Sequence, residues 1–67
     1  MTTETYTVTG MTCGHCAASV REEIEEIPGV RSVEVTVEGG RVEVSSDAPL
    51  ERSAIEQAVT EAGYQLA

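Results

Sequence analysis

Hydrophobic residues change their spacing repeatedly along this chain, within only 67 residues. Strict alternation of apolar and polar residues predicts a strand, whereas apolar residues three and four positions apart predict one face of a helix. The two patterns follow one another along the whole sequence. In chain order they predict a strand at 4–9, a helix at 16–27, strands at 30–38 and 41–46, a helix at 49–62 and a short strand at 64–66.

Each predicted helix has a single apolar face, and the strands alternate. The arrangement that buries all these faces at once is a four-stranded antiparallel sheet with both helices on one side. We therefore expect an α+β fold, the ferredoxin-like βαββαβ sandwich. A chain of this length has room for one hydrophobic core, so a single domain over residues 1–67 is predicted.

Two connections have recognisable turn and cap residues. Gly39 and Gly40 predict a two-residue hairpin turn between the central strands, because glycine tolerates the positive φ that such turns require. Before the second helix, Ser46 or Asp47 is expected to cap the helix, and Pro49 suits the first helical position.

The charge balance excludes several classes of partner. Four basic residues against twelve acidic ones give a net charge of −8, which repels nucleic-acid phosphates and anionic membrane surfaces. The aromatic residues are two tyrosines, so no stacking platform for single-stranded nucleic acid is present. No apolar run is long enough to span a bilayer, and the N-terminus lacks the features of a signal peptide. We expect a cytoplasmic protein without membrane insertion.

The residues best suited to binding or reaction lie in one short segment of the sequence. Cys13 and Cys16 are separated by two residues, between the first strand and the first helix. A disulfide between them would close a tiny ring and constrain little of the unfolded chain, so metal binding or redox chemistry is the better interpretation. The start of a helix favours thiolate over thiol, because its unpaired N–H groups and dipole are positive there. Two soft thiolates suit Cu(I) best, and they also bind Zn(II).

The possible ligands do not complete a structural zinc site, which needs four. The chain offers at most Cys13, Cys16 and His15, since it has two cysteines and one histidine. An incomplete, exposed dithiolate is what a metal carrier needs, because the thiols of a partner must reach the ion. This is the first indication that the protein transports a metal rather than catalysing a reaction.

The segment Gly-Met-Thr-Cys-Gly-His-Cys-Ala-Ala-Ser-Val at 10–20 resembles the signature of heavy-metal-associated domains, which has Met-Thr-Cys-x-x-Cys at its centre. These are small ferredoxin-like domains that occur as free copper chaperones and as N-terminal modules of copper-transporting P-type ATPases. The likeness extends over the whole chain, including its length, its element order, the Pro-Gly-Val turn at 28–30 and the closing Ala-Gly-Tyr at 62–64.

The resemblance implies roles for five residues. Cys13 and Cys16 would bind Cu(I) as a near-linear bis-thiolate, and Met11 would pack under the loop without binding the metal. Tyr64 matches a tyrosine that bacterial chaperones place near the metal loop, although simple packing is an equal interpretation. His15 matches a bacterial variant in which it tunes the thiolates or joins the site in a dimer; an exposed loop histidine is the alternative.

The resemblance also implies a function. We expect a copper chaperone, not an enzyme, that passes Cu(I) by ligand exchange to a copper-transporting P-type ATPase or to a copper-responsive regulator. A copper-bridged homodimer is a further expectation. The glutamates of the first helix, Glu22, Glu23, Glu25 and Glu26, are either the docking patch for such a partner or an ordinary solvated face.

Three other functions remain open. The chain resembles an N-terminal module of an ATPase as well as a chaperone, although the closeness of Met1 to the first predicted strand and of Ala67 to the last one favours a free protein. Cys13 and Cys16 are also the residues that a thiol–disulfide oxidoreductase would use. A carrier of mercury or zinc has the same sequence features.

Overall fold

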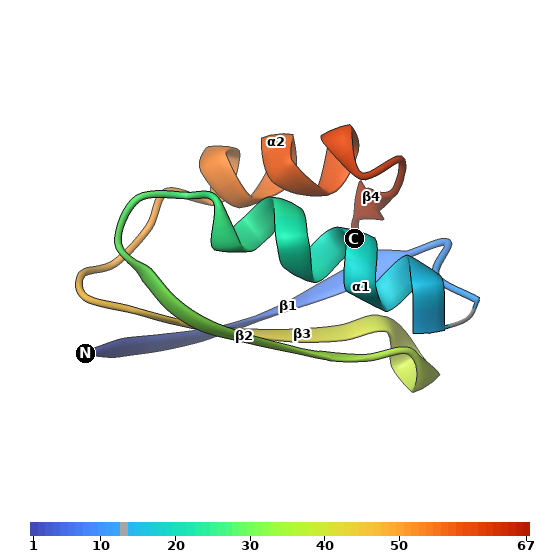
Figure 1. Ribbon diagram of the computed structural model, residues 1–67, viewed down its shortest axis with the longest axis horizontal. Coiled ribbons are helices and arrows are strands. Elements are labelled where there is room, and N and C mark those ends of the chain that lie inside the picture. The colour runs from blue at the N-terminus through green and yellow to red at the C-terminus, as the bar shows by residue number, and fades with distance from the viewer. Residues whose placement is uncertain (13) are drawn as a thin grey trace.

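The sheet and the two helices form two layers (Figure 1). Within residues 1–12 and 14–67, which the computed structural model describes, the elements are β1 (Thr2–Thr9), α1 (Gly14–Glu25), β2 (Val30–Thr36), β3 (Arg41–Ser46), α2 (Arg52–Glu61) and β4 (Gln65–Leu66). The strands form one antiparallel sheet in the order β2-β3-β1-β4. This confirms the predicted ferredoxin-like βαββαβ fold.

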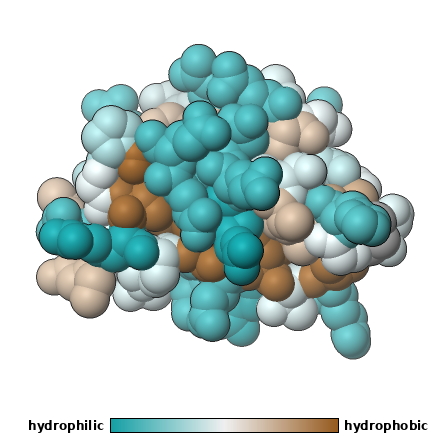
Figure 2. Space-filling model, in the orientation of Figure 1, coloured by the Kyte–Doolittle hydropathy of each residue, from teal (hydrophilic) through white to brown (hydrophobic). Residues whose placement is uncertain are grey.

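The core lies between the helices and the sheet. Alternate residues of the strands point toward the helices, among them Val8 of β1 and Val42 of β3. Ile24 of α1 and Ile55 of α2 are completely buried against them. The opposite surface of α1 is polar, and Figure 2 shows hydrophilic side chains across the middle of this view, where α1 lies in Figure 1. No helix in the described part of the chain is long and apolar enough to cross a membrane.

The connection between β2 and β3 differs from the prediction. Thr36 pairs with Arg41, so four residues, 37–40, join the strands. Three of them, Glu38–Gly40, form a short 3-10 helix in which the Gly40 N–H donates to the Val37 carbonyl at 3.0 Å. Gly39 and Gly40 have positive φ angles of 81° and 67°, as expected. The prediction of a two-residue turn was wrong.

The start of α2 was also predicted wrongly. The helix begins at Arg52 with Glu51 as its N-cap residue, so Pro49 lies in the preceding connection. The two expected caps are engaged elsewhere. The buried hydroxyl of Ser46 donates to the Ala48 carbonyl at 2.7 Å, and Asp47 accepts from Nε of Arg31 at 2.6 Å.

The first helix begins and ends two residues earlier than predicted. Its first residues, Gly14 and His15, are exposed and therefore outside the apolar stripe from which the helix was predicted. At the other end, Ile27 precedes Pro28, and a residue before proline is disfavoured in the helical conformation. The helix ends at Glu25, and the earlier start places Cys16 as its third residue.

Candidate metal centre

The loop that carries the cysteines connects β1 to α1 at one end of the sheet (Figure 1). Cys16 is half-buried in the opening turn of α1, as predicted. Cys13 lies outside the residues that the structure describes, so its predicted role as a metal ligand stays a prediction. The structure therefore places one of the two candidate ligands.

The surroundings of Cys16 favour its ionised form. The first turn of α1 contains no acidic residue, and the positive end of the helix dipole stabilises a thiolate at this position. The hydroxyl of Thr12 lies 3.9 Å from Sγ of Cys16. Thr12 was not singled out from the sequence, although its position four residues before Cys16, at the start of a helix, is a signal for such a contact.

Two residues hold the loop against the body of the protein. The side chain of Met11 is half-buried and packs against the core, as the resemblance implied. The ring of Tyr64 lies against Gly10, where Cδ1 would be only 3.3 Å from a Cβ atom. Tyr64 thus packs on the first residue of the loop, so the two interpretations of Tyr64, packing and closeness to the loop, describe the same contact.

His15 is the second residue of α1, and its side chain is exposed. Within residues 1–12 and 14–67, no three side chains of His, Cys, Asp or Glu gather as a group that could hold a metal ion. The loop remains the candidate site, as the sequence indicated.

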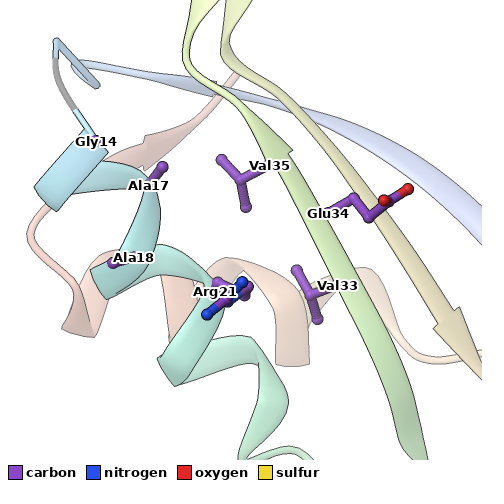
Figure 3. A pocket seen from close by; sticks show the side chains of 7 residues that line it. All are labelled: Gly14, Ala17, Ala18, Arg21, Val33, Glu34 and Val35. Atoms are coloured by element: carbon purple, nitrogen blue, oxygen red, sulfur yellow. The ribbon is translucent and has the colours of Figure 1, made fainter.

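An open cleft lies beside the loop, between the first half of α1 and the edge strand β2 (Figure 3). Gly14, Ala17, Ala18 and Arg21 supply its helical side, and the first three of these residues are small. Val33 and Val35 point from β2 toward α1, whereas Glu34 points away (Figure 3). This surface gives another molecule room to approach the start of α1.

The four glutamates of the predicted acidic patch do not all line one surface, and their role in docking stays a prediction. Glu23 and Glu26 line a groove between the helices, together with Glu61 of α2, whereas Glu25 forms an ion pair with Arg21 at 3.9 Å. Glu61 was missed because it is distant in the sequence and no local pattern connects it to α1. The groove lies toward the end of α1, away from Cys16.

Comparisons with known proteins agree with the fold. The profile of the heavy-metal-associated domain family matches residues 5–65. A protein named copper chaperone CopZ from Staphylococcus aureus is 37% identical over 67 residues, which cover 98% of each chain.

Two solved structures are similar over nearly their whole length. A CopZ metallochaperone has a TM-score of 0.90 and 34% identity, with 98% of this chain and 100% of that one covered. A copper binding domain from HMA7, a P-type ATPase, has a TM-score of 0.89 and 28% identity, with 100% and 92% covered.

Proposed function

The chain belongs to the heavy-metal-associated domain family, and on that premise we propose that it is a cytoplasmic copper chaperone, a carrier rather than an enzyme. The observation that carries the proposal is the spacing of Cys13 and Cys16, with Cys16 in the opening turn of α1. Similarity to a copper chaperone over 98% of the chain supports the choice of copper. The domain of the carrier is proposed to be residues 1–67.

The proposed ligands are the thiolates of Cys13 and Cys16, and the proposed cargo is Cu(I). Soft thiolates prefer this soft ion, and two of them satisfy its low coordination number. The start of α1 lowers the cost of holding negative charge on sulfur, so the thiols lose their protons on binding. The hydroxyl of Thr12 lies 3.9 Å from Sγ of Cys16, and it would be the donor once that sulfur is a thiolate.

Transfer then proceeds by ligand exchange without oxidation or reduction. A thiolate of the partner forms a bond to Cu(I), after which one bond from Cys13 or Cys16 breaks and that sulfur takes up a proton. A second exchange completes the transfer. The proposed partner is the metal-binding domain of a copper-transporting P-type ATPase, supported by the similarity to such a domain. The open cleft beside Ala17 and Ala18 leaves room for the approaching thiols.

The test is an anaerobic titration of the reduced protein with Cu(I) against a coloured Cu(I) chelator, with Zn(II) in parallel. We expect one equivalent of Cu(I) to be taken from the chelator, and the double variant Cys13→Ser, Cys16→Ser to take none. The matched control is Ser19→Ala, at an exposed position about one turn after Cys16 in α1. This variant should bind Cu(I) as the wild type does. If the wild type cannot compete with the chelator, the proposal is wrong.

A further inference from the structure

A groove of about 310 Å³ runs between the second half of α1 and α2, on the side of the helices open to solvent. Its floor is apolar: Ala58 is buried, and Ile27 is half-buried. Its rim carries three carboxylates, Glu23 and Glu26 from the end of the first helix and Glu61 from the end of the second. The groove thus combines an apolar floor with a negative rim.

The rim carboxylates are close enough to repel one another. Partial desolvation raises the pKa of Glu23 above its ordinary value, and the neighbouring charges of Glu26, Glu61 and Glu22 raise it further. The ionised form of Glu23 is therefore destabilised by the negative charges around it. A cation placed in the groove would attract these carboxylates and offset their repulsion.

The protein does not supply such a cation from its own described residues. All four arginines are engaged elsewhere: Arg21 with Glu25 at 3.9 Å, Arg31 with Asp47 at 2.6 Å, Arg41 with Glu43 at 3.5 Å, and Arg52 with the Ala67 carbonyl at 2.7 Å. Among residues 1–12 and 14–67, none of these pairs includes a rim carboxylate.

We propose that this groove is a docking surface for a basic amphipathic segment of a partner protein. An apolar side chain of the segment would rest on Ile27 and Ala58, while its Lys or Arg groups pair with Glu23, Glu26 and Glu61. Charge-assisted hydrogen bonds of this kind are about twice as strong as neutral ones. A second copy of this chain does not fit, because each copy carries a charge of −8 and the two repel.

The groove is separate from the metal loop. Glu23, the rim residue nearest to Cys16 in the sequence, lies seven residues after it, roughly 10 Å along a helix at 1.5 Å per residue. A partner can therefore hold this surface while its own thiols approach the loop. The docking goes beyond the proposed copper transport and does not depend on bound metal.

The test is a titration of the 15N-labelled, metal-free protein with a synthetic amphipathic helical peptide of Lys, Leu and Ala, about 15 residues long. We expect amide shifts confined to the second half of α1 and to α2. The triple variant Glu23→Gln, Glu26→Gln, Glu61→Gln should bind the peptide about ten-fold more weakly, the loss of roughly one strong ion pair. Ile27→Ala should also weaken binding, because it removes part of the apolar floor.

The matched control is Glu34→Gln, Glu38→Gln, Glu51→Gln, which removes the same number of exposed charges outside the groove. If this control weakens binding as much as the groove variant does, the peptide responds to net charge and the proposal is wrong. Shifts spread over the whole surface, or none at all, also overturn it. The Cys13→Ser, Cys16→Ser variant should bind the peptide normally, which separates this result from the outcome of the copper titration.

Discussion

Gly40 lies against the backbone of β1, in space that no side chain can share. It is buried, and a Cβ atom at this position would overlap the carbonyl oxygen of Val8. Its neighbour Gly39 has a similar positive φ but open space around it. Both glycines therefore have a backbone conformation that disfavours other residues. Only Gly40 is also in close contact with another strand.

Alanine substitutions at Gly39 and Gly40 distinguish the cost of backbone strain from the cost of steric overlap. Gly39→Ala should lower the free energy of unfolding by about 1–2 kcal/mol, the cost of a left-handed conformation for an L-residue. Gly40→Ala should lower it by about 3–5 kcal/mol, because β1 must also move away. Urea unfolding followed by circular dichroism measures both values. Equal losses for the two variants would contradict the close packing of Gly40 on Val8.

At the scale of elements, α2 begins without a side-chain cap. The carbonyl of Glu51 accepts from the N–H of Ala54 at 3.0 Å, but its carboxylate accepts only the hydroxyl of Ser53, at 3.4 Å, and no backbone N–H. Aspartate has a shorter side chain, which reaches the first N–H groups of a helix from this position. The helix is held mainly by the burial of Ile55 and Val59.

Glu51→Asp should therefore stabilise the protein, by about 0.5–1 kcal/mol, because it adds a cap and keeps the charge. The control is Glu56→Asp, the same change at an exposed interior position of α2, which should destabilise by a few tenths of a kcal/mol, roughly, through lower helix propensity. Thermal unfolding of the two variants beside the wild type measures the difference. A loss of stability at both positions would show that the N-terminus of α2 needs no cap.

At the scale of the whole molecule, carboxylates from both halves of the sequence come close together beside the helices, with Glu61 near Glu23 and Glu26. The folded protein raises the pKa of Glu23 by desolvation and by the charges of Glu26, Glu61 and Glu22. A carboxyl group with a raised pKa in the folded state binds protons more tightly there than in the unfolded chain. Its favourable contribution is present at low pH and is lost as the pH rises through the folded pKa.

Glu23→Gln should consequently make the protein more stable than the wild type near pH 7, and the gain should disappear at about pH 3, where the carboxyl is protonated in both states. Glu38→Gln, outside the groove, is the control for the loss of one exposed charge. Urea midpoints across this pH range give the comparison. A gain for Glu23→Gln that persists at low pH would indicate packing rather than charge.

Local patterns in the sequence determined the order of the elements and the faces that they bury. The alternation around Val42 and Val44 and the helical spacing through Val20 and Ile24 each lie within a few residues, and the structure buries all four. The position of Cys16 at the start of a helix was determined in the same way. These features could be predicted because strand and helix periodicity depends on near neighbours.

Tertiary contacts alone decided the β2–β3 connection, the start of α2 and the acidic groove. The connection has four residues because Gly40 packs on Val8, and Asp47 does not cap α2 because it pairs with Arg31. The groove exists because Glu61 faces Glu23 across two helices. In each case the partner is distant in the chain, so the competing interaction appears only when the elements are packed together.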